Sequence, residues 1–124
     1  MLMDLSGRTD GTLGEIRPSD EVRCGPVWVS PEELCEVRVD GIRLDLSATH
    51  RRMLAALLRA RGRVLTRADL YEVAHHRRMK RGSRAIDVHV VRIRKALGSL
   101  GTHILTVPGV GYRVDVTELE GRDI

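Results

Sequence analysis

The sequence of 124 residues has few aromatic side chains: one Trp, two Tyr and no Phe. A core must therefore be aliphatic, and stacking of bases on an aromatic platform, as in many single-strand and RNA binders, is poorly supported. No apolar run approaches the roughly 20 residues that cross a bilayer. The first residues also lack the basic start and apolar run of a secretory signal. We therefore expect a cytoplasmic protein without a membrane partner.

Residues that commonly bind metals, form disulfides or hold phosphates are also few, or lack the spacing that those sites require. Cys24 and Cys35 have no metal-ligand spacing, and we expect two small buried or half-buried apolar residues rather than a disulfide. His75 and His76 adjoin in a basic stretch without a carboxylate or thiolate at a useful spacing, so no metal site is predicted. Residues 108–111, Pro-Gly-Val-Gly, lack the following helix and Lys-Ser/Thr of a phosphate loop. The sequence predicts no enzyme, no cofactor and no small-molecule substrate.

Charge is unevenly distributed along the chain. Residues 1–47 hold five Arg and ten acids, residues 48–113 hold fifteen Lys or Arg and three acids, and residues 114–124 hold one Arg and four acids. The middle segment therefore concentrates the positive charge, although the whole chain is only +4. A polyanion bound there would release condensed counterions. The acidic flanks argue against a uniformly sticky cationic protein.

The most informative stretch is residues 84–97, which read as one helix with two different faces. Its apolar residues recur at the spacing that buries one face; they are Ile86, Val90, Ile93 and Leu97. The opposite face and its flanks carry Arg84, Val88, His89, Val91, Arg92, Arg94 and Lys95. No acid follows Asp87 in this helix, so its cations lack local partners. Such a helix can anchor in a small core and contact DNA; a solvated basic surface helix is the alternative.

Two further helices are predicted before this one. Ser47 is placed to cap the first, whose apolar stripe consists of Met53, Leu54, Leu57 and Leu58. The second runs from about Arg67 to Ala74, after the capping box that begins at Thr66. Ser83 is a candidate cap for the helix over 84–97.

Strands are predicted on both sides of the helices. Alternating residues between Val27 and Leu46, interrupted by a hairpin signal at Asp40-Gly41, predict a small antiparallel sheet. Residues 104–107 and 112–116 flank Pro-Gly-Val-Gly and predict a second hairpin.

The order of these elements defines the expected fold. We predict an α+β fold, a winged helix-turn-helix with an N-terminal antiparallel sheet, a three-helix core and a C-terminal β-hairpin wing. The domain spans residues 22–116, between flexible tails at 1–21 and 117–124.

Four runs of sequence resemble the C-terminal DNA-binding domain of OmpR/PhoB-type response regulators. They are Gly-Arg-Val-Leu-Thr-Arg-Ala-Asp-Leu at 62–70, Ser-Arg-Ala-Ile-Asp-Val-His-Val at 83–90, Arg-Ile-Arg-Lys-Ala-Leu at 92–97 and Thr-Val-Pro-Gly-Val-Gly-Tyr-Arg at 106–113. The resemblance implies a sequence-specific regulator of transcription that binds double-stranded DNA. It places helix 84–97 in the major groove and wing 104–116 on the backbone or in the minor groove.

Individual roles follow from the same resemblance. In the family, residues matching Arg84, His89, Arg92 and Arg94 touch phosphates or bases, and those matching Thr106 and Tyr112 hold the backbone from the wing. Geometry favours Arg92 for bidentate recognition of guanine, whereas His89 could instead serve in packing. Val91 stands where many relatives have a polar or basic reader, and it can touch a thymine methyl but cannot hydrogen-bond to a base. The complete predicted DNA-binding set is Arg84, His89, Val91, Arg92, Arg94, Lys95, Thr106, Tyr112 and Arg113.

A basic loop before helix 84–97 has no acid among its residues, which include His75, His76, Arg77, Arg78, Lys80 and Arg81. Two interpretations compete. The loop could add phosphate contacts along the DNA flank, or it could dock on an acidic surface of RNA polymerase, such as a sigma factor or the alpha subunit. An idle solvated loop is the third alternative.

The expected partners are double-stranded DNA and a second copy of the chain, bound head to tail on direct repeats about one helical turn apart. The N-terminal tail is too short for a receiver domain, so we expect a stand-alone or excised effector domain on the nucleoid. The competing hypothesis is a protein-interaction winged helix that docks on RNA polymerase or another regulator and binds little DNA.

Overall fold

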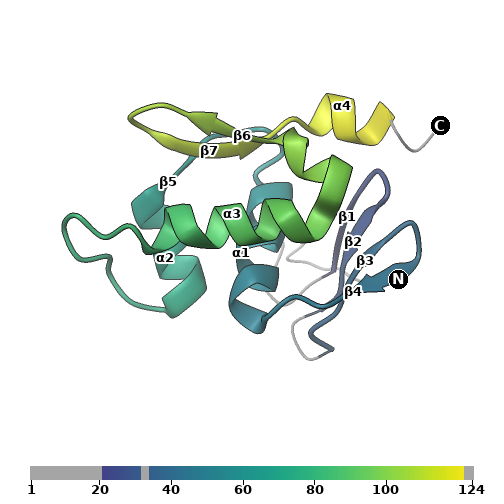
Figure 1. The fold of residues 1–124 in the computed structure, drawn as a ribbon, viewed down its shortest axis with the longest axis horizontal. Coiled ribbons are helices and arrows are strands. Elements are labelled where there is room, and N and C mark those ends of the chain that lie inside the picture. Colours follow the sequence, from purple (N-terminus) through teal and green to yellow (C-terminus); the bar gives the residue numbers. More distant parts are fainter. Residues whose placement is uncertain (1–20, 32–33, 122–124) are drawn as a thin grey trace, which may run out of the picture.

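The computed structural model describes residues 21–31 and 34–121. The first three α-helices pack between two small sheets that lie on different sides of them, and a short fourth α-helix follows (Figure 1). The elements before the helices are β1 (Val22–Cys24), β2 (Val27–Val29), β3 (Val37–Val39) and β4 (Ile42–Leu44). The helical region contains α1 (Ala48–Arg59), β5 (Leu65–Thr66), α2 (Arg67–His75), α3 (Ala85–Leu97) and a 3₁₀ helix at Gly98–His103. The chain continues with β6 (Ile104–Val107), β7 (Gly111–Val114) and α4 (Val116–Gly121).

The first sheet is an antiparallel meander in the order β1-β2-β3-β4. The predicted turn at Asp40-Gly41 is confirmed: φ is +52° and +78° at these two residues, and β3 pairs with β4 directly across them. A two-residue loop with both φ values positive fits the twist of the flanking strands. Strand β1, at residues 22–24, was not predicted, because the predicted sheet began at Val27.

The helix caps follow the predictions in two cases and differ in the third. The Ser47 hydroxyl accepts a hydrogen bond from the backbone N–H of His50 at 3.2 Å. Thr66 and Asp69 form the expected capping box, with both bonds at 3.0 Å. The N-cap of α3 is Arg84, which makes no side-chain cap bond. Ser83 precedes it by one residue, and its hydroxyl accepts from the N–H of Ala85 at 3.3 Å.

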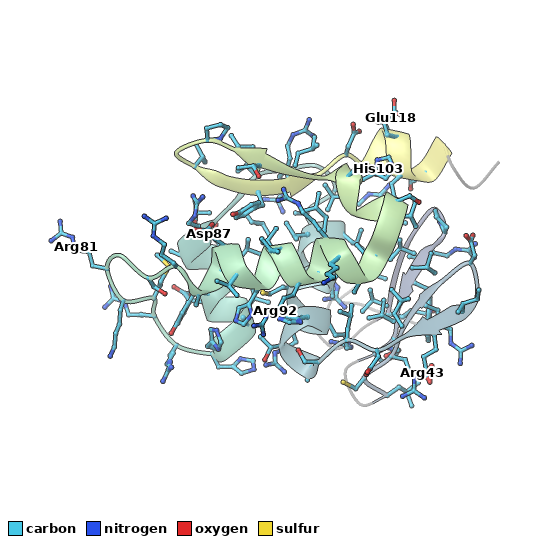
Figure 2. All side chains as sticks on the ribbon, viewed as in Figure 1. Arg43, Arg81, Asp87, Arg92, His103 and Glu118 are labelled. Atoms are coloured by element: carbon cyan, nitrogen blue, oxygen red, sulfur yellow. The ribbon has the colours of Figure 1, made fainter. Side chains whose placement is uncertain are left out.

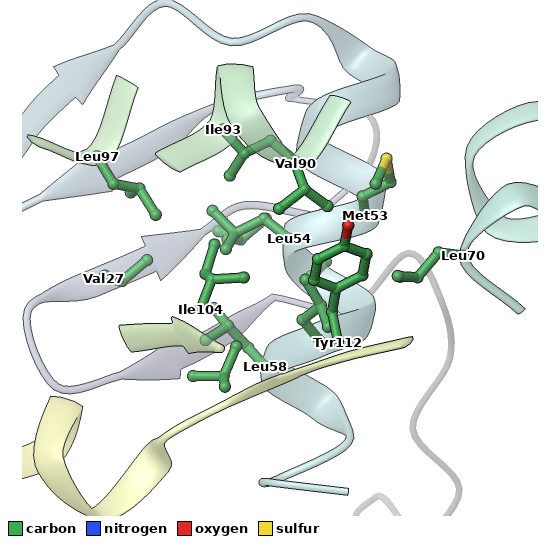
Figure 3. Packing of buried hydrophobic residues seen from close by; sticks show 14 of the residues in the cluster. Val27, Met53, Leu54, Leu58, Leu70, Val90, Ile93, Leu97, Ile104 and Tyr112 are labelled. Carbon is green, nitrogen blue, oxygen red and sulfur yellow. The ribbon is translucent and has the colours of Figure 1, made fainter. Parts of the chain in front are cut away.

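The core is aliphatic, as the composition predicted. All four residues of the stripe on α3 are buried, and so is the stripe on α1. The Tyr112 ring enters the same cluster beside Met53 and Leu70 (Figure 3). Arg51 is also buried, at 1% exposure, although its neighbours His50 and Arg52 are only half-buried.

The wing belongs to a three-stranded sheet in the order β5-β7-β6. Strand β5, only two residues long, pairs with β7 through Leu65 and Tyr112 and through Thr66 and Gly111. A Cβ added at Gly111 would lie 2.0 Å from the carbonyl oxygen of Leu65. Glycine is therefore required at this position, because the two backbones approach too closely for a side chain.

The carboxyl-terminal end corrects one prediction. Residues 116–121, expected to be mostly a flexible tail, form helix α4, and Leu119 is 3% exposed. A Cβ at Gly25 would lie 2.3 Å from the carbonyl oxygen of Leu119, so the turn between β1 and β2 packs closely on α4. The expected tail at 1–21 lies outside the described residues except for Glu21.

Two smaller points concern the cysteines and the membrane. Cys24 is buried as expected, but Cys35 is exposed, because it lies with φ +49° in the loop before β3. Both are free thiols. No helix in the described ranges is long and apolar enough to cross a bilayer.

Candidate DNA-binding surface

The outer face of α3 presents a mixed apolar and cationic surface. Val88 and Val91 are 48% and 61% exposed, and Arg92 and Lys95 are also exposed. Over the described residues, the guanidinium of Arg92 makes no hydrogen bond or ion pair. The opposite side of the helix is fixed in the core, so these four side chains are held on a rigid element and remain available to a ligand. We call them the α3 face.

Arg94, predicted on the same surface, is turned toward the wing. Its Nη2 donates to the carbonyl oxygen of Ile104 at 2.7 Å and to the hydroxyl of Thr106 at 2.9 Å, and its Nε also donates to Ile104. The guanidinium lies 5.6 Å from the centre of the Tyr112 ring. Arg94 therefore joins α3 to β6, which reduces the donors that it can offer to DNA.

Tyr112, predicted to hold the DNA backbone, instead points into the domain. It is 4% exposed, and its hydroxyl donates to Oδ1 of Asp87. Arg67 donates to the same carboxylate oxygen at 2.8 Å. Figure 2 shows Asp87 between α3 and the hairpin.

The electrostatics of this contact follow from its hydrogen bonds. The bond from Tyr112, and then the bond and charge of Arg67, lower the pKa of the Asp87 carboxyl despite partial burial. Burial, followed by the bond to Asp87, raises the pKa of Tyr112. Asp87 is therefore ionised and Tyr112 neutral near pH 7, the states that this hydrogen bond requires.

His89 lies at the edge of the α3 face and is half-buried between two other histidines. Its Nδ1 is 2.9 Å from Nε2 of His50, and its Nε2 is 3.3 Å from Nε2 of His75. Burial and then the charge of Arg92 lower the pKa of His50; burial and then His50, His75 and Arg92 lower that of His89. His89 is thus held within the domain rather than extended from it.

The basic loop lies at the opposite end of the domain from the first sheet (Figure 1). His75 is the last residue of α2, and His76 is its C-cap with φ +56°. The loop cations are exposed; they are Arg77, Arg78, Lys80 and Arg81. Figure 2 shows Arg81 at the tip, pointing away from the body. Met79 packs against the core and anchors the loop in its middle.

The remaining predicted residues are divided between the helix start and the wing. Arg84 is exposed beside a hollow of about 240 Å³ that Arg67, Ser83 and Asp87 also line. Thr106 is exposed on β6, and Arg113 is half-buried on β7.

Three residues near this surface were absent from the predicted set. Val88 was assigned to the outer face but not to the site, and its place one helical turn before Val91 was the available signal. His50 and Arg67 reach the region from other helices, so nothing in their local sequence indicates it.

Together, the buried side of α3, its exposed outer face and the hairpin packed beside it define the winged helix-turn-helix class of domain. Residues 41–114 match the family model described as "Transcriptional regulatory protein, C terminal", and the chain belongs to that family. This result confirms the resemblance to OmpR/PhoB-type effector domains.

Characterised relatives agree with this assignment. The chain is 33% identical over 114 residues to the phosphate regulon transcriptional regulatory protein PhoB of Pseudomonas aeruginosa, covering 89% of this chain and 49% of that protein. The chain therefore spans about half the length of this relative. Its fold is similar to the DNA-binding domain of CpxR from E. coli, with a TM-score of 0.69, 25% identity, and coverage of 77% of this chain and 96% of that one. The RstA DNA-binding domain of Klebsiella pneumoniae, solved in complex with the RstA box, gives a TM-score of 0.66 at 25% identity, with coverage of 77% and 96%.

Proposed function

We propose that this domain binds double-stranded DNA in a sequence-specific manner and regulates transcription. The α3 face carries the proposal, because it places one unpaired arginine beside two exposed valines on a helix whose other side is fixed in the core. An α-helix fits the major groove, where arginine can bond the O6 and N7 of guanine and an apolar group can contact the thymine methyl.

Relatives support the same function. The RstA domain was solved with its DNA box, and PhoB of Pseudomonas aeruginosa is named as a transcriptional regulatory protein. By analogy, the proposed alternative of a winged helix that binds only protein receives less support.

The proposed contacts fall into three groups. Arg92, Val91 and Val88 face base edges, while Arg84 and Lys95 bind phosphates at either end of α3. From the wing, Thr106 and Arg113 approach the backbone or the minor groove. Arg94 and Tyr112 act indirectly, by holding the wing against α3.

Two copies are proposed to bind head to tail on direct repeats about one helical turn apart, because one α3 can read only a few base pairs. A footprint with one isolated half-site fully occupied at low protein concentration would argue against this arrangement. The proposed location is the cytoplasm, on the nucleoid.

The basic loop suits a second role. Its exposed cations could extend the phosphate contacts along the DNA flank or dock on an acidic surface of RNA polymerase, and the first is favoured by their position beside the start of α3. A footprint with and without polymerase distinguishes these roles, since only docking alters the polymerase boundary.

A salt titration tests the proposal as a whole. Binding through about six to eight phosphates predicts that log K falls with log salt at a slope near −5 to −7. A protein-interaction domain would show weak DNA binding with no preferred sequence at any salt concentration.

A further inference from the structure

Three histidines, one from each helix of the core, form a continuous chain of imidazoles. His50 of α1 and His75 of α2 lie on either side of His89 of α3. The ring centres are 4.9 Å apart for His50 and His89 and 5.3 Å apart for His75 and His89. All three are half-buried.

The geometry is that of a hydrogen-bonded chain rather than a chelate. His89 directs Nδ1 toward one neighbour and Nε2 toward the other. A metal ion needs one nitrogen from each ring aimed at a common point, which a central ring using both nitrogens does not provide. A neutral imidazole has one donor and one acceptor nitrogen, so neutral His89 can satisfy both neighbours at once.

The number of donor and acceptor nitrogens limits how many added protons the three histidines can hold while keeping their hydrogen bonds. One added proton can reside on His50 or His75, and that ring then donates to His89, which donates in turn to the other terminal ring. A second added proton leaves both terminal rings as donors, and His89 cannot accept at both nitrogens while it retains its own N–H. The cluster therefore accepts one extra proton without losing its hydrogen bonds.

The groups facing the cluster are cationic or neutral. Arg92 faces it from α3. Arg52, from α1, donates to the carbonyl oxygen of Ala74 at 2.8 Å, next to His75 on α2. The Tyr71 ring, also on α2, has its centre 4.5 Å from that of His75. No carboxylate in the described ranges is paired with any of the three rings. Protonation of the three histidines is therefore unfavourable in the free domain, whereas a nearby phosphate would favour it.

We propose that His50 and His75 are positioning residues for His89, and that the three-histidine cluster takes up one proton when the domain binds DNA. The proposal rests on the proposed function, because the α3 face must approach a polyanion for the proton to be stabilised. DNA affinity should then increase as the pH falls toward the titration range of histidine. The two flanking rings keep His89 oriented and share the proton with it.

The test is the affinity for a selected duplex, measured by fluorescence anisotropy at constant ionic strength from about pH 8 to about pH 6. The wild-type domain should bind more tightly at the acid end, with up to about a tenfold change per pH unit where uptake of one proton is steepest. The triple variant His50→Gln, His75→Gln and His89→Gln should lose most of this dependence, because glutamine keeps hydrogen-bonding groups but does not titrate. His103→Gln is the matched control, since it removes an imidazole at the end of the 3₁₀ helix, outside the cluster and outside the proposed DNA-binding surface.

The possible outcomes distinguish failure of the proton-uptake proposal from failure of the proposed DNA binding. No sequence-preferring DNA binding at any pH would overturn the proposed function itself. Binding that is insensitive to pH, or that weakens on acidification, would overturn the inference and leave DNA binding intact. The same conclusion follows if the triple variant keeps the wild-type dependence or if His103→Gln abolishes it.

A second measurement avoids substitutions and therefore any loss of folding. Imidazole ¹⁵N shifts of the wild-type domain, titrated with and without duplex, report the protonation of each ring directly. A rise in the proton affinity of the cluster on adding DNA supports the proposal, and unchanged titration curves refute it.

Discussion

The hydroxyl of Tyr112 donates a hydrogen bond to the carboxylate of Asp87, so β7 of the wing and α3 are joined through a buried side chain. Arg67 of α2 bonds the same carboxylate. Together with the bonds from Arg94 to β6, this contact fixes the angle between α3 and the hairpin. The proposed reading surface therefore depends on residues that do not themselves touch DNA.

Tyr112→Phe tests this connection. Removing the hydroxyl leaves Asp87 without one of its donors, and we expect the free energy of unfolding to fall by about 1–2 kcal/mol. Urea denaturation measures the change. Tyr71→Phe is the matched control, because Tyr71 is also buried but its hydroxyl has no hydrogen bond to a described residue. Equal losses in both variants would show that the bond to Asp87 contributes no stability.

Arg51→Met should stabilise the domain. Arg51 is 1% exposed, and its Nη2 donates to the carbonyl oxygen of Ser30. Its Nε and Nη1 have no partner among residues 21–31 and 34–121. Methionine has a similar volume and no charge to desolvate, so we expect a gain of about 1–2 kcal/mol in the free energy of unfolding, net of the bond lost by Ser30. Arg51→Ala should lose stability instead, because it leaves a cavity. A destabilised Arg51→Met variant would mean that the buried guanidinium is favourable where it lies.

The stability of the free domain should decrease on acidification. The pKa values of His50 and His89 are lower in the folded domain than the ordinary value of 6.5 that the unfolded chain retains. Below about pH 6.5 the unfolded chain therefore binds more protons, and the free energy of unfolding falls with pH. Urea midpoints at about pH 7.5 and about pH 5 measure this effect. His50→Gln should reduce the difference between the two midpoints, and an unchanged difference would contradict the assignment.

Lys80→Ala tests the loop as a source of phosphate contacts. Lys80 is exposed, and its ammonium group has no hydrogen bond or ion pair in the described part of the chain. We expect weaker binding to all sequences alike and a salt slope about one unit shallower. Competition binding with specific and scrambled duplexes, repeated over a range of salt concentrations, measures the affinity and the salt slope. A change confined to the specific duplex would indicate that the loop reads sequence.

The sequence predicted most of the fold because its signals were local and redundant. The stripe from Ile86 to Leu97, the capping box at Thr66 and the turn at Asp40-Gly41 each depend on residues a few positions apart. Helix α4 was missed because it has six residues and buries only Leu119, which is too short for a periodic pattern. Strand β5 has two residues and exists only through its pairing with β7.

The site was predicted less completely, since its contacts join distant parts of the chain. The inward direction of Tyr112 could have been inferred from alternation with Val114, which is also buried on β7. The three-histidine cluster has no such signal, because its members are separated by 14 and 25 residues and meet only when the helices pack.

The most direct test of the central claim is selection of bound oligonucleotides by the wild-type domain, by Arg92→Ala and by Lys95→Ala. Both residues are exposed on the α3 face, but only Arg92 is proposed to read a base. Arg92→Ala should lose preference at one base pair, at a cost of about 1–3 kcal/mol there, while Lys95→Ala should weaken binding and select the same motif. If Arg92→Ala selects the wild-type motif unchanged, the α3 face does not read DNA as proposed.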